Sequence, residues 1–360
     1  MTNNRRIALL LPTLNGGGAE KVCIKIAQGC IDAGVEVHLV VIIPHMDYEV
    51  PKGLTVHTLL DCAKRSSRLH SVQKKAALAL SEYSSQMGGF DSIFANLLPA
   101  YAVAAMSGLN NVHYVVHNAV CPTLKQIGLR RPIKYLRARK ALSYLKGNQV
   151  IAVSCGIKQE LLSLSAFRPG NVEVIYNPLD IANIKKLAAY QPVDLPDEPY
   201  ILFVGRTAKQ KRIDRLLCAF GSIEKPVALL TLGASLKKYN KLISKLPSGK
   251  KIISLPFKQN PYAYIVNAQA LILCSDFEGF GMVLAEALAC GTPVISRNCP
   301  YGPNEILIHG LARYLVDSKD PKDIAKKIDT VLNETDYPFQ DAQLERFDLA
   351  QCVERYLSLV

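Results

Sequence analysis

Two glutamates stand eight residues apart in the otherwise apolar stretch SDFEGFGMVLAEALACGTPVI. Glu286 is the only charged residue in 282–290, where the pattern predicts a short helix that is apolar or small on every face. Because such a helix is usually buried and an unpaired buried charge is costly, we expect partners for the Glu286 carboxylate. Glu278 precedes it in a turn with Gly279 and Gly281, and the free N–H groups of a helix start favour an anion. This arrangement predicts a ligand rich in both hydroxyl and phosphate groups.

Two further loops carry groups that suit phosphate. The stretch LLPTLNGGGAEKV places three glycines, 16–18, between an apolar run and a helix, where the backbone could approach a ligand. In ILFVGRTAKQKRI, Arg206 and Lys211 follow a strand that ends at Gly205. Arg offers a planar fork of donors and Lys a point charge, and both suit a diphosphate. Taken alone, each loop could equally be a tight turn or a solvated basic loop.

His117 and Asn118 directly follow the strand pattern VHYVV, and the loop NCPYGPNEIL opens another helix. A lone histidine is more often structural than catalytic. The position of His117 at the end of a strand favours a role in a site, which gives the functional and the structural interpretation about equal weight. No D-x-D triplet, no G-x-S-x-G elbow and no His, Cys and Asp cluster with metal-ligand spacing occurs. We therefore expect neither a metal nor a cofactor.

The elements that must position these residues alternate between short β-branched runs and longer segments of helical spacing. Strand, helix and strand in repetition predict a doubly wound parallel α/β sheet. Prolines at 178, 192, 196 and 199 stand among acidic residues and predict a linker, after which the alternation restarts. We expect two Rossmann-like domains, 1–178 and 200–340, joined by a linker at 179–199, with 341–360 as a final helix. Because parallel sheets bind ligands at the carboxyl ends of their strands, the cleft between the domains is the expected site.

Composition is that of an ordinary globular protein with a large core. Of the 360 residues, 49% are hydrophobic and 20% are charged, and no apolar run approaches the ~18 residues of a membrane span. The apolar run near the N-terminus ends at Pro12 and is better explained as a first strand than as a signal peptide. Ten cysteines form no C-x-x-C pair. They predict buried thiols in a reducing compartment, which we take to be the cytoplasm.

The positive charge is concentrated in the first half of the chain. The net charge is +13, and residues 1–180 carry +9 of it. The segment 125–146 contains eight Lys and Arg, no acidic residue, and tyrosines and leucines at roughly helical spacing. A basic amphipathic helix can lie on an anionic membrane, bind nucleic acid or be solvated on one face.

Taken in order, these motifs resemble the family 4 retaining glycosyltransferases, which have the GT-B fold. The matching pieces are GGGAEK, HN at 117–118, VS at 153–154, NP at 177–178, GR with a Lys five residues later, and EGFGMVLAEALACGTPV. The last is the family's E-x7-E signature and the most specific. The similarity extends over about 7–356. The loop CPYGPNEIL is similar to loops of enzymes that build lipopolysaccharide, capsule or other lipid-linked glycans.

The resemblance implies roles for the residues of the second domain. Glu286 would hydrogen-bond the ribose hydroxyls of a nucleotide, and Glu278 would face the hydroxyls of the donor sugar. Backbone N–H groups would hold the phosphates along Gly279, Phe280, Gly281, Met282 and Val283. Arg206 and Lys211, after Gly205, would neutralise the departing diphosphate. The family's usual glycine after this lysine is Arg212 here.

In the first domain, the resemblance implies that His117 lies near the transferring face of the sugar, with Asn118 beside it. Gly17 and Gly18 would line the opposite wall and approach the diphosphate and the acceptor. The expected catalytic set is therefore His117, Arg206, Lys211 and Glu278. The final helix would cross back onto the first domain.

The resemblance also implies the reaction: a sugar passes from a nucleotide-sugar, expected to be a UDP-sugar, to a glycan acceptor with retention and without metal. Acceptors of this family are often lipid-linked, so we expect a peripheral enzyme on the inner face of the cell membrane. The residues expected to contact an anionic membrane or the acceptor are Arg130, Arg131, Lys134 and Arg137. A GT-B transferase with a soluble acceptor and a UDP-sugar epimerase are the alternatives. Phosphate-binding turns in both halves argue against a nucleic-acid binder.

Overall fold

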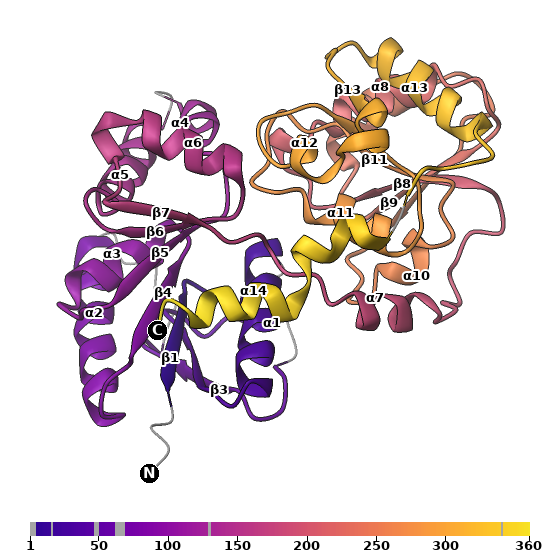
Figure 1. Ribbon diagram of the computed structural model, residues 1–360. Coiled ribbons are helices and arrows are strands. Elements are labelled where there is room, and N and C mark those ends of the chain that lie inside the picture. Colours follow the sequence, from indigo (N-terminus) through magenta and orange to yellow (C-terminus); the bar gives the residue numbers. More distant parts are fainter. Residues whose placement is uncertain (1–4, 16, 47–49, 62–68, 129–130, 340) are drawn as a thin grey trace. The chain divides into compact units, whose positions relative to one another are not determined.

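The computed structural model describes residues 5–15, 17–46, 50–61, 69–128, 131–339 and 341–360, with the side chains of 69, 70 and 342 left out. The chain divides into two compact units (Figure 1). The first unit comprises Met1–Pro178 together with Phe347–Val360, and the second comprises Leu179–Arg346. Each unit is built on its own parallel sheet.

The first unit contains a sheet of order β3-β2-β1-β4-β5-β6-β7 in which all neighbouring strands are parallel. The order reverses direction at β1, as in a doubly wound fold, and β1 and β4 are buried along most of their length. The strands are β1 Arg6–Leu11, β2 Glu36–Val41, β3 Thr55–Thr58, β4 Ser92–Asn96, β5 Val112–Val116, β6 Gln149–Ala152 and β7 Asn171–Val174.

Helices cover both faces of this sheet. In Figure 1, α1 and the C-terminal helix α14 lie side by side on one face, and α2 and α3 pack together on the other. The helices are α1 Gly18–Asp32, α2 Leu69–Gln86, α3 Leu98–Met106, α4 Val120–Ile127, α5 Pro132–Ser143, α6 Cys155–Ser163, the 3-10 turn η1 Ser165–Phe167, and α14 Leu349–Leu357.

The second unit has a sheet of order β10-β9-β8-β11-β12-β13, again parallel throughout. Helices α8 and α13 pack together, and α7, α10 and α11 form a second group. The strands are β8 Tyr200–Val204, β9 Ala228–Leu232, β10 Ile252–Leu255, β11 Ala270–Leu273, β12 Val294–Arg297 and β13 Leu315–Val316. The helices are α7 Ile181–Ala188, α8 Ile213–Gly221, α9 Asn240–Ile243, α10 Tyr262–Ile265, α11 Met282–Ala289, α12 Pro303–Ile306 and α13 Pro321–Asn333. The 3-10 turns are η2 Lys209–Lys211, η3 Lys237–Tyr239, η4 His309–Tyr314 and η5 Asp341–Phe347.

The prediction of an α/β fold with two Rossmann-like sheets is thus confirmed. The stretch 179–199, for which a linker is predicted, instead contains helix α7 and belongs to the second unit. Asp180 caps this helix by accepting a hydrogen bond from the Asn183 N–H at 3.0 Å, and Ile184 and Ala188 are buried. The prolines before and after this short amphipathic helix led to the prediction of a linker. Within the described residues, no helix is both long and apolar enough to cross a membrane.

Candidate functional site

Glu278 is buried at the carboxyl end of β11 in the second unit and has two donors on one oxygen. Its Oε1 accepts hydrogen bonds from Lys211 Nζ at 2.8 Å and from Ser275 Oγ at 2.5 Å. Its Oε2 accepts no hydrogen bond from the described residues. The carboxylate is therefore held in place by one oxygen, and the other can accept a hydrogen bond from a hydroxyl group.

The turn after Glu278 is fixed by the loop that precedes α12. The Glu278 N–H donates to the Pro300 carbonyl at 2.8 Å, and the Tyr301 N–H donates to the Glu278 carbonyl at 3.3 Å. A Cβ atom on Gly302 would lie 2.0 Å from the Phe280 carbonyl oxygen, so only glycine permits this approach. Gly281 then opens α11 with φ 93°, and no described side chain caps that helix start. The predicted anion seat is thus a preformed turn.

Glu286 lies on α11, is 7% exposed and accepts a hydrogen bond from Tyr262 Oη at 2.9 Å. Burial is the main cause that raises the pKa of Tyr262 well above its usual value, and Glu286 adds to it. The Tyr262 hydroxyl therefore remains protonated and donates to the carboxylate. This contact supplies the partner that a charge in an apolar helix requires.

The basic loop after β8 separates into an exposed and a paired part. Arg206 is exposed and forms no ion pair with any described residue, whereas Lys211 is paired with Glu278. Arg212 adopts the left-handed conformation, with φ 50°, and its guanidinium is paired with Asp214 and Asp276. This conformation is easiest for glycine, and the two ion pairs hold an arginine in it.

In the first unit, His117 follows β5 and its ring Nε2 lies 2.8 Å from Asn96 Oδ1. The Asn96 amide donates to the Phe94 carbonyl at 2.8 Å, so its oxygen faces the ring and His117 Nε2 is the donor. Burial lowers the pKa of His117 to about 4, so the ring is neutral near pH 7. His117 Nδ1 is then a buried acceptor, and it has no hydrogen-bond partner among the described residues.

The glycine loop of the first unit already holds a carboxylate. A Cβ atom on Gly17 would lie 2.1 Å from Glu20 Oε2, so the Glu20 carboxylate folds back onto the start of α1. Asn15 Oδ1 nearby is buried without a partner among the described residues. Gly17 and Gly18 do open α1 after β1, while Gly16 lies outside the described residues. His117 Nδ1 and Asn15 Oδ1 are both buried acceptors, and each suits a hydroxyl donor.

Several residues that sequence reasoning missed hold the predicted ones. Ser275 and Tyr262 donate to Glu278 and Glu286, and Asn96 orients His117. Ser275 and Asn96 stand at or just after strand ends, which is a signal that could have identified them. Tyr262 lies 24 positions from Glu286 with no such signal. The site residues proposed from the sequence remain predictions in their roles.

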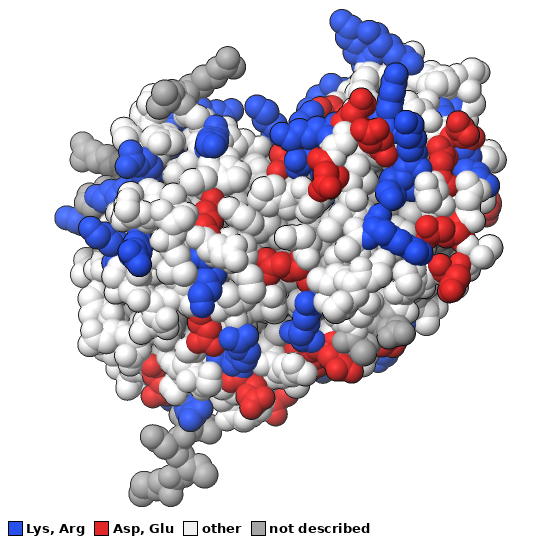
Figure 2. All heavy atoms as spheres, turned by 45° about the horizontal axis from the view of Figure 1, so that its top comes forward, with Lys and Arg blue, Asp and Glu red and all other residues white. Residues whose placement is uncertain are grey.

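Helix α5 is basic and exposed on one side. Arg131, Lys134 and Arg137 are exposed, while Arg130 lies outside the described residues. Ile133 is 65% exposed and Leu136 62% exposed. In Figure 2, Lys and Arg side chains project along the edge of the first unit that α4 and α5 form. Because residues three and four apart share a helix face, apolar and basic side chains alternate on one surface.

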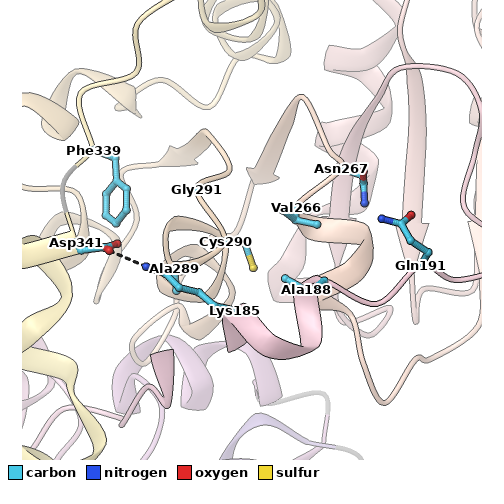
Figure 3. A pocket seen from close by; sticks show the side chains of 11 residues that line it. Lys185, Ala188, Gln191, Val266, Asn267, Ala289, Cys290, Gly291, Phe339 and Asp341 are labelled. Atoms are coloured by element: carbon cyan, nitrogen blue, oxygen red, sulfur yellow. Dashed lines mark hydrogen bonds and ion pairs between the residues drawn. The ribbon is translucent and has the colours of Figure 1, made fainter. Parts of the chain in front are cut away.

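A separate groove of about 610 Å³ lies in the second unit, at the end of α11 away from Glu278. Figure 3 shows the Lys185–Asp341 ion pair at one end and the amides of Gln191 and Asn267 at the other. The Cys290 thiol lies between them, and burial raises its pKa to about 12. The groove contains none of the predicted site residues. Across the described parts of the chain, no group of three or more His, Cys, Asp or Glu could hold a metal ion.

Two family models match the chain, one for each half. Glycosyltransferase Family 4 matches residues 16–183, and Glycosyl transferases group 1 matches residues 190–344. A relative from Campylobacter jejuni is 26% identical over 92% of this chain and 91% of its own. It is named N-acetylgalactosamine-N,N'-diacetylbacillosaminyl-diphospho-undecaprenol 4-alpha-N-acetylgalactosaminyltransferase. A lipopolysaccharide 1,6-galactosyltransferase from Salmonella typhimurium is 29% identical over 45% of this chain and 46% of its own.

Solved structures have the same fold. HepE from Anabaena, crystallised with UDP and glucose, superposes with a TM-score of 0.75 at 20% identity over 99% of both chains. The lipopolysaccharide outer core galactosyltransferase WaaB superposes with a TM-score of 0.68 at 20% identity over 98% of both chains. At these identities the likeness establishes the architecture of two parallel sheets, which is the GT-B fold.

Proposed function

Because the chain belongs to the group 1, or family 4, glycosyltransferases and uses a nucleotide-sugar donor with retention, we propose that its donor is a UDP-sugar and its acceptor a lipid-linked glycan. The observation that supports a sugar nucleotide best is the pair of buried carboxylates at both sides of the α11 start. Glu278 and Glu286 are each held by neutral or cationic donors of the protein. Such carboxylates can accept hydrogen bonds from the hydroxyls of a sugar and a ribose, while the open turn of α11 receives the phosphates.

In the proposed reaction, the bond between the anomeric carbon and the diphosphate oxygen breaks while an acceptor hydroxyl bonds to that carbon on the same face. The hydroxyl proton passes to the departing phosphate oxygen. Arg206 and Lys211 would stabilise the charge that develops on the diphosphate. Lys211 donates one hydrogen bond to Glu278. Two further donors of its ammonium group can serve the phosphate, so Lys211 would couple the sugar-binding carboxylate to the leaving group.

The first unit would contact the sugar through acceptor atoms. His117 Nδ1 and Asn15 Oδ1 are both buried acceptors at the carboxyl edge of the first sheet. A buried acceptor without a donor is costly, and a sugar hydroxyl would satisfy it.

A lipid-linked acceptor is supported by the Campylobacter jejuni relative, which is named for an acceptor joined through a diphosphate to undecaprenol. It is also supported by the alternating basic and apolar face of α5. We therefore place the enzyme on an anionic membrane surface, and on its cytoplasmic side, where the free cysteines would stay reduced. We also propose that the transfer proceeds without a metal, with Arg206 and Lys211 supplying the positive charge.

Calorimetric titration with UDP, GDP, ADP and CDP in EDTA tests the donor assignment. We expect UDP alone to bind, and we expect Glu286→Ala to weaken it by about 1–3 kcal/mol through loss of the charged acceptor. Glu354→Ala, at an exposed position of α14, is the matched control and should bind as the unaltered chain does. Tighter binding of another nucleotide would change the donor class, and unaltered UDP binding by Glu286→Ala would refute the ribose assignment.

A further inference from the structure

A buried carboxylate outside the predicted site caps the helix that follows His117. Glu160 lies on α6 and is 6% exposed. Its Oε2 accepts the Val120 N–H at 2.7 Å, and its Oε1 accepts the Cys121 N–H at 2.8 Å. These are the first two N–H groups of α4. One carboxylate thus binds two adjacent backbone donors of a different helix.

Helix α4 depends on this contact because it has no cap of its own. Its N-cap residue is Ala119, which provides no side-chain acceptor. The first N–H groups of a helix lack partners within the helix and carry its positive dipole end, so a buried carboxylate there is favourable. Glu160 in turn has no ion pair with a described residue. Both oxygens of the Glu160 carboxylate accept backbone N–H groups of α4, so the position of this side chain is tied to the start of α4.

Only three residues separate β5 from α4, and the first two are His117 and Asn118. His117 is anchored to β4 through Asn96, and Asn118 Oδ1 accepts the Ala119 N–H at 3.0 Å. The far end of this short connection is anchored to α6 by Glu160. With so few residues between the anchors, a shift of the α4 start displaces the His117 ring.

We propose that Glu160 is a positioning residue that sets the place of His117 and Asn118 by capping α4 from α6. The proposal rests on the role proposed for His117 in the reaction. Displacement of a reacting group by about 1 Å can cost ~100-fold in rate. Affinity for UDP itself should change little, because the proposed nucleotide contacts belong to the second unit.

Chemical rescue tests this directly. Glu160→Ala leaves two N–H groups facing a vacated carboxylate site, which added formate can occupy. We expect kcat to fall roughly 10- to 100-fold with the affinity for UDP nearly unchanged, and formate to restore at least several-fold of the lost rate. Glu160→Gln should lose activity without rescue, because its amide fills the same space. The matched control is Leu161→Ala, which removes a fully buried side chain of α6 and should be insensitive to formate.

The position of the His117 ring is read independently by NMR, so the proposal remains testable whatever the donor and acceptor are. We expect its ring signals to move in Glu160→Ala and to return when formate is added. Unmoved signals in a folded Glu160→Ala chain, or an unchanged kcat, would overturn the positioning role. Moved signals that formate fails to restore would show that capping is not the means. Restored signals without any transferase activity in the unaltered chain would refute the proposed function and leave the positioning role intact.

Discussion

The protonation state of His117 is fixed by its surroundings. Burial lowers its pKa to about 4, and Asn96 accepts from Nε2. We expect the ring to stay neutral, with the proton on Nε2, through the range near pH 6.5 where an exposed histidine titrates. Between pH 6.5 and pH 4 the unfolded chain binds a second proton on this imidazole and the folded chain does not. The free energy of unfolding therefore decreases as the pH is lowered through this range, and the contribution of the neutral ring is lost near pH 4. Nitrogen-15 NMR of the imidazole across pH 3–8 measures the titration directly.

An inflection of the His117 signals near 6.5, or a proton on Nδ1 at neutral pH, would contradict the acceptor role. Asn96→Ala should release the ring and allow both tautomers, because no other described group accepts from Nε2.

At the residue scale, the sequence identified the charged residues of the candidate site but not the side chains that hydrogen-bond to them. A glutamate in an apolar helix signals a partner, yet the partner Tyr262 belongs to a different helix with its own burial pattern. Arg212 illustrates the same limit. Its left-handed backbone and its pairing with Asp276 depend on tertiary contacts that no local pattern encodes.

Elements with a clear period were predictable, whereas helix α3 and strand β3 were missed. Helical spacing in the sequence predicts helices over 19–33 and 213–223, and α1 and α8 lie in these two stretches. Helix α3 was not predicted, because it is apolar on nearly every side and shows no 3.6-residue period of apolar and polar positions. Strand β3 is only four residues long at the sheet edge. Helical spacing in the sequence also predicts one helix over 236–246, whereas the structure has the turn η3 and the short helix α9 in this stretch.

At the scale of a single element, we make a prediction for the exposed basic face of helix α5. If its exposed face lies on anionic lipid, Arg137→Glu should weaken binding to phosphatidylglycerol vesicles by about 2 kcal/mol, since each basic residue near such a surface contributes about 1 kcal/mol. Vesicle co-sedimentation at low and high salt measures this, and both binding and the effect should diminish as salt screens the charges. Lys75→Glu on α2 makes the same charge change at another exposed position. Equal loss in both variants would indicate net charge rather than a binding face.

At the scale of the whole molecule, the chain begins and ends in the same unit. Phe347–Val360 belongs to the first unit, where α14 packs against α1. A Cβ atom on Gly29 of α1 would lie 2.5 Å from Val353 Cγ2, so the two helices are in close contact. Arg355 also pairs with Glu173 at 3.0 Å. The resemblance implied this return of the final helix, and composition alone gave no reason for it.

The core of the first unit is therefore incomplete without its last helix. Tyr356 is 2% exposed and packs edge-on against Phe94 of β4, with ring centroids 5.1 Å apart. We expect Tyr356→Ala to lower the free energy of unfolding by about 3–5 kcal/mol, as for other large aromatic truncations in a core. Each unit has its own hydrophobic core, so scanning calorimetry should show the loss in the transition of the first unit. The control Tyr190→Ala, at a side chain 61% exposed, should change neither transition. A single transition that Tyr356→Ala shifts as a whole would mean that the units unfold as one, and the final helix would then stabilise the whole chain rather than complete one sheet.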